Sequence, residues 1–352
     1  MLSQEQIQEI RELLNRSQNP LFFFDNDLDG LTSFLLLRRF SGKGKGVAIK
    51  SFPELNQTYS RKLTELNPDY VFILDKPLVA EDFIKECIEK NIIVVWIDHH
   101  PRPFKEDHPI YKNVQYFNPL LNEKPTNEPV SYWSYKIANK KEDKWISMLG
   151  CISDWFIPDF ANEIAEEYPD LFPKLNKDQQ AKALYETEMG KLAKMLSFAL
   201  KDRTSNVLKM LKYLTMIKVP QELLEKNSKN SSIFQRFKQI DRKYEKLMEK
   251  AKEIGKVNKK LLFFQYGGDM SVSGELSNEL FYNFQDMVIV VCYIKGNKVN
   301  VSVRGSTDVR TLTAKSLEGI EASHGGHERA CGANLSVEDL PKFRDNMIKL
   351  TK

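Results

Sequence analysis

Short apolar runs alternate with amphipathic stretches over the first hundred residues of the chain. Three of these runs, residues 21–24, 70–74 and 92–97, are continuous and are bounded by polar or turn residues. Continuous apolar runs of this length are typical of strands buried on both faces, as in a parallel sheet. Helical periodicity between the runs indicates crossover helices. The pattern therefore predicts an α/β fold that opens with a parallel sheet built from βαβ units.

Each of these apolar runs ends at or just before an aspartate, namely Asp25, Asp75 or Asp98. Open α/β sheets bind ligands at the carboxyl ends of their strands, so we expect these acids to share one site. A fourth apolar stretch, residues 145–152, leads to Asp154 and is read as a helix or a strand. Residues 101–129 contain six prolines, which predicts a loop over the sheet face.

The remainder of the chain divides into a helical part and a second α/β part. One apolar stripe from Ile233 to Ile254 predicts a long helix that Gly255 caps. This helix either connects two domains or packs on the first. Strands are expected at residues 261–265, 287–294 and 298–303, and helices at 275–282, 309–317 and 337–349. We predict a metal-binding domain at 1–160, a helical segment and connecting helix at 161–256, and a smaller substrate-binding α/β domain at 257–352.

Composition narrows the class of protein only a little. The 352 residues are 41% hydrophobic and 28% charged, which is typical of a soluble globular protein. Fifty-two Lys and Arg against 48 Asp and Glu leave a formal charge of +4. This weakly basic balance permits a polyanionic ligand without requiring one. If several carboxylates bind metal ions, the remaining surface is more basic than the total.

The four cysteines lie far apart and form no CxxC pair, so the sequence indicates reduced thiols rather than disulfides or a zinc site. No run of about 18 apolar residues occurs, and the N-terminus is charged and amphipathic. We therefore expect a cytoplasmic protein without a membrane segment.

The segment Asp25-Asn26-Asp27-Leu28-Asp29-Gly30 places three carboxylates at alternate positions directly after an apolar strand. In a turn that leaves a strand, this spacing lets several carboxylates converge on hard divalent cations. The alternative is a calcium loop. Such a loop needs a glutamate further along, where this chain has the apolar run 34–37, and it follows a helix rather than a buried strand.

A second candidate motif is Asp98-His99-His100, which contains two of the five histidines in the chain. An imidazole at a strand end can join carboxylates on a transition-metal ion. Because neighbouring residues of a strand point to opposite faces, we expect one histidine to be a ligand and the other to face substrate. The alternative, a pair of surface histidines, fits poorly behind a buried strand and an aspartate.

Taken together, these residues resemble the DHH phosphoesterase family, and the first motif is most similar to that of its RecJ nuclease branch. The four matching motifs, in chain order, are 25–30, Asp75, 98–100 and Asp154 in Leu149-Gly150-Cys151-Ile152-Ser153-Asp154. The resemblance implies two divalent ions, Mn²⁺ preferred and Mg²⁺ accepted. On this resemblance Asp25 and Asp27 would hold one ion, while Asp29, His99 and Asp154 would hold the other. Asp75 would bridge the pair, which lies about 3.5–4 Å apart in two-metal sites.

The resemblance also assigns roles around the metals and in the second domain. His100 would contact the scissile phosphate, with Asp98 orienting it. The run Gly325-Gly326-His327 resembles the GGH signature of the DHH-associated C-terminal domain, and Arg304 lies in the strand that precedes it. Glycines let backbone N–H groups approach a phosphate closely, and Arg304 and His327 can donate to one. Read alone, the glycine run is an ordinary tight turn, and Arg310 and His324 are read as surface residues.

Two positions depart from the family pattern. Phe23 stands where many relatives carry a metal-binding histidine, so Asp25 would have to substitute for it. Lys76 follows Asp75 directly, where a small or neutral residue is commoner. This lysine is read as solvated, with a phosphate contact as the alternative.

Three functions follow from the resemblance. The leading one is an exonuclease on single-stranded DNA or RNA or on oligonucleotides, with its active site in the cleft between the domains. A second is a phosphodiesterase that cleaves short RNA, dinucleotides or cyclic dinucleotides. The third is a replication scaffold of the same fold without activity, with replication or repair proteins as partners. Sugar preference, polarity and oligomeric state are left open.

Overall fold

The protein is described by a computed structural model that covers residues 1–51, 54–102, 104–105, 107–257 and 260–351. The chain divides into two compact units, residues 1–237 and 238–352. Helix α11 (Ser231–Val257) begins in the first unit and continues into the second. The domain boundaries expected near residues 160 and 256 stay a prediction.

A five-stranded parallel sheet forms the centre of the first unit, in the order β2-β1-β3-β4-β5. Its strands are β1 (Leu21–Asp25), β2 (Lys45–Ile49), β3 (Tyr70–Leu74), β4 (Ile93–Ile97) and β5 (Val114–Phe117). The predicted parallel sheet is confirmed, because β1, β3 and β4 coincide with the three apolar runs. The loop expected over 101–129 is wrong at β5, where four residues pair with β4 and complete the sheet.

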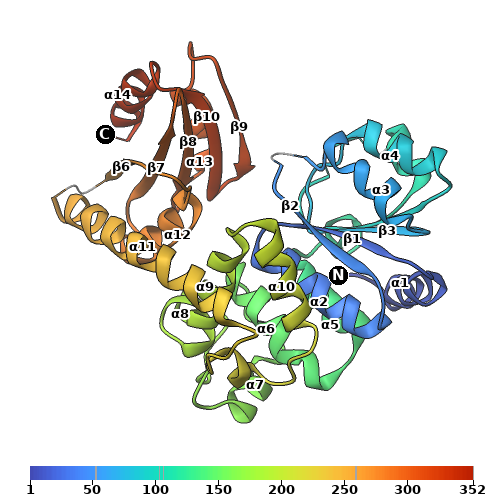
Figure 1. The fold of residues 1–352 in the computed structure, drawn as a ribbon. Helices are drawn as coiled ribbons and strands as arrows, with labels where there is room; N and C mark the ends of the chain where they lie inside the picture. Colours follow the sequence, from blue (N-terminus) through green and yellow to red (C-terminus); the bar gives the residue numbers. More distant parts are fainter. Residues whose placement is uncertain (52–53, 103, 106, 258–259, 352) are drawn as a thin grey trace. The chain divides into compact units, whose positions relative to one another are not determined.

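Helices cover both faces of this sheet, so that the first unit has three layers (Figure 1). Alternate side chains of β1 divide between the two layers: Phe22 and Phe24 join one apolar core, and Leu21 and Phe23 join the other. The second core includes α3 (Arg61–Leu66) and α4 (Glu81–Glu89). The larger first core includes α1 (Gln4–Arg16), α2 (Leu28–Ser41), α5 (Val130–Ala138), α6 (Lys144–Ser153), α7 (Ala161–Glu167), α8 (Gln180–Tyr185), α9 (Glu188–Leu200) and α10 (Thr204–Leu214).

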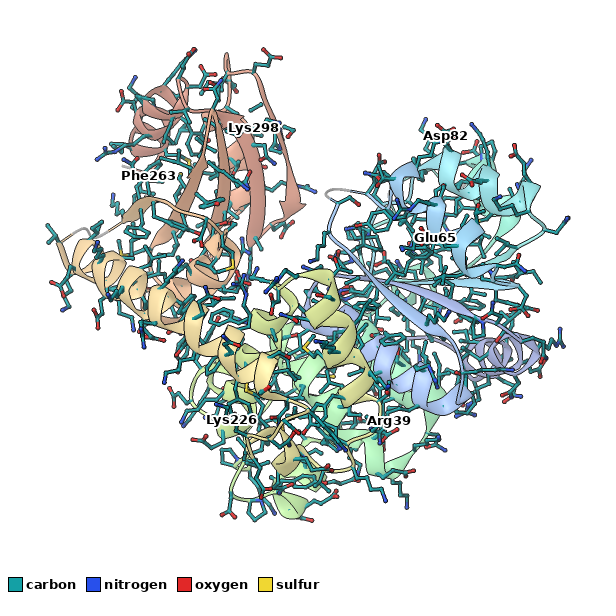
Figure 2. All side chains as sticks on the ribbon, viewed as in Figure 1. Arg39, Glu65, Asp82, Lys226, Phe263 and Lys298 are labelled. Carbon is teal, nitrogen blue, oxygen red and sulfur yellow. The ribbon has the colours of Figure 1, made fainter. Side chains whose placement is uncertain are left out.

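Side chains on the two outer layers reach solvent, as Figure 2 shows for Glu65 of α3 and Asp82 of α4. Arg39 of α2 lies on the opposite side of the sheet, where its guanidinium pairs with the buried Asp143 at 2.6 Å.

The second unit has a mixed sheet in the order β6-β7-β8-β10-β9. Only β6 and β7 pair in parallel among these neighbours. The strands are β6 (Leu261–Gly267), β7 (Val288–Lys295), β8 (Lys298–Arg304), β9 (Ala322–His327) and β10 (Ala330–Ser336). Helices α13 (Val309–Ser316) and α14 (Leu340–Leu350) share an apolar core with one face, and α12 (Ser273–Asn283) packs on β7 and β8. The predicted smaller α/β domain is confirmed.

Helix α11 confirms the long helix that the apolar stripe predicted, but not its end. Gly255 was expected to cap the helix, and this is wrong because helical residues continue to Val257. A Cβ atom on Gly255 would lie 2.6 Å from the ring of Phe284. Glycine is needed here for close packing inside the second unit rather than for a turn. No helix of the described part of the chain is both long and apolar enough to cross a membrane.

Candidate metal centre

The first motif forms the turn from β1 into α2. Asp25 is the last residue of β1, and Asp27 caps α2 by accepting a hydrogen bond from the Gly30 amide at 2.9 Å. Gly30 packs against the strand it has just left, and a Cβ there would lie 2.5 Å from the Asp25 carbonyl oxygen. This tight strand-to-helix turn brings the alternating carboxylates to the carboxyl end of the sheet.

Asp29 is fully buried in the first turn of α2. Its carboxylate accepts hydrogen bonds of 2.8 Å from the backbone amides of Val130 and Ser131, the first residues of α5. These two bonds from the N-terminus of α5 fix the orientation of the Asp29 carboxylate. Each carboxylate oxygen keeps a second lone pair for a cation.

Asp75 follows β3 directly and is 2% exposed. Its backbone has a φ of +56°, in the left-handed region that aspartate and asparagine tolerate better than most residues. The Asp75 amide donates to the Ile97 carbonyl at 2.9 Å. This bond to the end of β4 fixes Asp75 next to the segment that carries the histidines.

Both histidines of the second motif approach Asp75. His99 Nε2 lies 3.4 Å and His100 Nδ1 lies 3.8 Å from Asp75 Oδ1, and the two rings are 4.5 Å apart. The expectation that they point to opposite faces is wrong. Strand β4 ends at Ile97, so the alternation of a strand no longer applies to the two residues.

Asp154 completes the group from a different helix. It follows α6, and its Oδ2 lies 3.5 Å from His99 Nε2. Two sets of potential ligand atoms lie within 4.8 Å of one another among the described residues: Asp29, His99 and Asp154 form one, and Asp75, His99 and His100 form the other.

Two atoms at the centre of this group lack hydrogen bonds. Asp75 Oδ1 and His99 Nε2 are buried, and no described residue satisfies them. Unsatisfied buried polar atoms are costly, and oxygen and imidazole nitrogen together suit divalent transition metals. The residues therefore fit a divalent ion at His99, held either with Asp29 and Asp154 or with Asp75 and His100.

Burial and neighbouring charges shift the pKa values of Asp75 and His99. Burial, and then the charges of Asp27, Asp29 and Asp154, raise the pKa of Asp75 well above its usual range. Burial and the neighbouring His100 lower the pKa of His99. His99 is therefore neutral at pH 7, which is the form in which imidazole binds metals.

Asp98 forms a hydrogen bond with His100 and is not part of either ligand group. It is fully buried, and its Oδ1 lies 2.9 Å from His100 Nδ1. Burial opposes the charged imidazole, but the charge and hydrogen bond of Asp98 outweigh it and raise the pKa of His100 to about 9. Asn118, which the sequence reasoning missed, donates to the His100 carbonyl at 2.8 Å. His100 is thus a fixed, protonated imidazole beside Asp75.

Lys76 is not solvated, contrary to the prediction. Its side chain is 2% exposed, and Nζ lies 2.8 Å from Asp25 Oδ1. The same ammonium donates to the Ser51 carbonyl at 3.2 Å, while the Lys76 carbonyl accepts from the indole of Trp96 at 2.8 Å. A buried ammonium needs a charged partner, and Asp25 provides it.

Two family models match the sequence. The N-terminal domain of the DHH family matches residues 21–143, and the DHHA1 domain matches residues 257–352. This chain contains a DHH-family domain and a DHHA1 domain. A comparison with curated proteins finds no match.

Solved structures show that this DHH protein has a RecJ-like fold. RecJ from Thermus thermophilus in complex with Mn²⁺ is 14% identical, with a TM-score of 0.66 over 98% of this chain and 54% of RecJ. This chain thus spans about half of that RecJ. The DHH domain of a protein described as a member of a ribosomal-protein family is 14% identical, with a TM-score of 0.71 over 98% of this chain and 90% of the other. The pGpG-specific phosphodiesterase PggH from Vibrio is 13% identical, with a TM-score of 0.51 over 95% and 99%.

The DHHA1 domain of this DHH protein contains the remaining predicted site residues. Arg304 is the last residue of β8, and His327 is the last residue of β9. Both pair in register with Ala330, the first residue of β10, which lies between them in the sheet. The three positions therefore form one line across the sheet. The His327 side chain lies outside what the structure describes. Arg304 Nε donates to Asn278 of α12 at 2.6 Å, a contact that no sequence signal indicated.

The two glycines of the GGH run are strand residues rather than a tight turn. Gly326 pairs with Cys331 and Gly325 with Gly332 across β9 and β10. Gly326 has a φ of +140°, and a Cβ there would lie 2.4 Å from the Ala330 carbonyl oxygen. Gly325 has no atom within 4 Å of such a Cβ. Gly326 is therefore required by the backbone, and Gly325 leaves open space above the strand.

Proposed function

We propose that this DHH protein hydrolyses phosphodiester bonds in nucleic acid or short nucleotide chains with the help of a divalent metal ion, for which Mn²⁺ is the preferred choice. The observation that carries the proposal is the pair of ligand groups that share His99, one with Asp29 and Asp154 and the other with Asp75 and His100, in which Asp75 Oδ1 and His99 Nε2 have no hydrogen bond from a described residue. Oxygen-rich ligand sets with one imidazole suit manganese, and Mg²⁺ is the second choice.

A divalent ion in this group would polarise a phosphate oxygen and acidify a bound water. The side chains of the protein supply the rest of the chemistry. Asp98 accepts the Nδ1–H of His100, and the protonated ring also carries a donor at Nε2. His100 can stabilise the phosphate oxygens or protonate the sugar oxygen that leaves. Asp98 acts through His100 as its positioning residue.

Within this class, the favoured activity is that of a RecJ-like exonuclease on single-stranded nucleic acid or oligonucleotides. Arg304 supports a phosphate contact in the DHHA1 domain, because Asn278 and the Val303 carbonyl hold its guanidinium in one orientation. Gly325 supports close approach of a phosphate to the backbone of β9. Both features suit a ligand with several phosphates.

A second candidate is a phosphodiesterase for dinucleotides or other very short chains. The observation that favours it is the fold: the pGpG-specific phosphodiesterase PggH matches 95% of this chain with a TM-score of 0.51. Such an enzyme would use the same metal centre. The non-catalytic scaffold is less favoured, because two groups of potential ligand atoms lie together around His99.

The experiment is a time course on end-labelled DNA and RNA strands of several lengths, down to dinucleotides, with Mn²⁺. A ladder from one end supports the exonuclease and reveals its polarity; loss of dinucleotide alone selects the second candidate. Asp75→Asn should abolish cleavage, and Asp82→Asn is the matched control because Asp82 is an exposed partner of Lys85. No metal-dependent cleavage of any strand or dinucleotide would contradict the proposal and favour the scaffold.

A further inference from the structure

The carboxylate of Asp25, at the end of β1, is already paired with a positively charged side chain. Lys76 Nζ lies 2.8 Å from Asp25 Oδ1, and the lysine side chain is 2% exposed. Moving Lys76 out of this position would cost free energy, because hydrogen bonds hold both its ammonium and its backbone carbonyl. The Ser51 carbonyl accepts from the ammonium, and the buried Trp96 indole donates to the Lys76 backbone carbonyl.

Strand β1 offers no other ligand in place of Asp25. Phe23, two residues earlier and on the same face of the strand, is fully buried. Its ring packs edge to face against Phe83 and Tyr59, at centroid distances of 5.3 and 6.0 Å. Position 23 is therefore part of an apolar core and carries no metal-binding atom.

The potential ligand atoms are distributed unevenly over the site. Both sets that could hold an ion among the described residues contain His99, and neither contains Asp25 or Asp27. One side of the site thus has a complete group of oxygen and nitrogen ligands. The other side has a carboxylate paired with a fixed ammonium.

From this arrangement we propose that Lys76 takes the place of one metal ion, so that the site binds a single divalent ion at His99, the residue that both ligand groups share. The ammonium is a compact point charge, and its ion pair with Asp25 offsets the carboxylate charge without coordination. A dication on Asp25 would have to displace this charge or sit beside it, and like charges at such distances repel strongly. This inference rests on the proposed function only in that the site binds metal.

Metal stoichiometry tests the inference directly. The full chain is stripped with a chelator and titrated with Mn²⁺, and bound metal per chain is measured by equilibrium dialysis and elemental analysis. Electron paramagnetic resonance adds an independent readout, because two Mn²⁺ ions about 4 Å apart, as in two-metal sites, couple magnetically. We expect one Mn²⁺ per chain and a spectrum without coupling.

Lys76→Met removes the ammonium while keeping an unbranched apolar stem. We expect this variant to bind a second Mn²⁺ through the released Asp25 and to show a coupled spectrum. Lys136→Met is the matched control, because Lys136 pairs with Asp159 at 2.9 Å instead of with a residue of the site. It should bind one Mn²⁺, as the unchanged protein does.

The double variant Asp25→Asn with Lys76→Met protects the test against misfolding, since it leaves neither charge buried alone. We expect it to bind one Mn²⁺ with an affinity within about threefold of the unchanged protein. If the unchanged protein bound two ions and this variant bound one, Asp25 would be a metal ligand in the presence of Lys76, and the inference would be overturned.

Two coupled Mn²⁺ ions in the unchanged protein, or a single ion in correctly folded Lys76→Met, would also overturn it. These outcomes are separable from failure of the proposed function. Two ions with nucleotide release would leave the phosphodiesterase standing and remove the role of Lys76. One bound ion without cleavage of any substrate would leave the role of Lys76 standing and remove the phosphodiesterase. Binding of no Mn²⁺ at all would end both.

Discussion

The imidazole Nε2 of His99 lies 3.4 Å from Oδ1 of Asp75, and neither atom has a hydrogen bond from a described residue. The two side chains come from the ends of neighbouring parallel strands, β4 and β3. Their approach is the structural basis of the metal centre, because it puts an imidazole nitrogen and a carboxylate oxygen of two different loops at one point. Both the activity and the stability of the protein should depend on this pair.

Replacement of Asp75 by asparagine should separate activity from stability. Asparagine keeps the shape and tolerates the φ of +56°, but it cannot take on the negative charge that burial and four other carboxylates oppose in the folded protein. We expect loss of Mn²⁺ binding and of cleavage, together with a melting temperature of the metal-free protein that rises by about 2–4 °C, the shift that ~1 kcal/mol produces in a domain of this size. Differential scanning calorimetry measures the shift. Asp75→Ala should raise the melting temperature less than Asp75→Asn, because alanine is strained at this φ. Equal rises in the two variants would contradict this effect of the backbone angle.

Stabilisation by Mn²⁺ should grow with pH. The raised pKa of Asp75 means that the folded, metal-free protein keeps a proton that the unfolded chain releases near pH 4. Stability of the metal-free protein therefore falls as the pH rises above about 4, until Asp75 ionises in the folded state as well. Metal binding needs the ionised carboxylate and so strengthens over the same range. Thermal unfolding with and without Mn²⁺ at about pH 5.5, 6.5 and 7.5 measures the difference; a constant metal-induced shift would contradict this reasoning.

Asp98→Asn should move the alkaline limit of activity to lower pH. In the unchanged protein the pKa of His100 is about 9, because the Asp98 charge and hydrogen bond outweigh burial. Without that charge the pKa should fall toward the ordinary value of about 6.5, so the protonated ring is lost at pH 8. We expect kcat to fall about 30-fold at pH 8, where about 3% of the ring stays protonated, and much less at pH 6, with KM little changed. The check is a pH profile of kcat, with Asp82→Asn as control. A uniform loss at all pH values would point to a merely structural role of Asp98.

The two glycines of β9 should respond differently to alanine. Gly326→Ala puts a Cβ 2.4 Å from the Ala330 carbonyl at a φ of +140°, and should destabilise the second unit by about 1–3 kcal/mol. Gly325→Ala meets no atom within 4 Å and should leave the melting temperature unchanged. If a phosphate approaches this strand, Gly325→Ala should instead raise KM. Chemical denaturation and steady-state kinetics of both variants decide the matter, and equal stability losses would contradict the assignment.

Asn278→Ala should weaken substrate binding through Arg304. The side-chain carbonyl of Asn278 accepts from Arg304 Nε at 2.6 Å, and its loss lets the guanidinium adopt other orientations. We expect KM to rise about five- to tenfold with kcat nearly unchanged, since part of a preorganised phosphate contact is lost. Arg304→Lys should show a similar effect, because a lysine cannot donate in a fork. An unchanged KM in both variants would remove Arg304 from the substrate site.

Much of the first unit could be predicted because its signals are local. A strand buried on both faces must be apolar at every position, and this made β1, β3 and β4 visible as uninterrupted runs. Strands β2 and β5 were missed because they lie at the edges of the sheet and carry partly exposed residues. Strand β9 was missed because Gly325 and Gly326 have low strand propensity, and only pairing with β10 makes them extended.

The partners of individual side chains were harder to predict than the elements. Nothing in the neighbourhood of Lys76 in sequence shows that its ammonium meets Asp25, 51 residues earlier. The contact arises because β1 and β3 are adjacent in the sheet, so that their ends lie side by side. The same holds for Asn278 and Arg304, which α12 and β8 bring together across 26 residues.

The sequence by itself determined that acids and histidines gather at the carboxyl ends of parallel strands, since hydrophobic periodicity places the strands and the residue that follows each run is read off directly. Only the tertiary structure decided which of these groups face one another. Side-chain approach depends on strand order, on the backbone turn after each strand and on what is buried nearby. Those factors turn both histidines toward Asp75 and bring the ammonium of Lys76 onto Asp25.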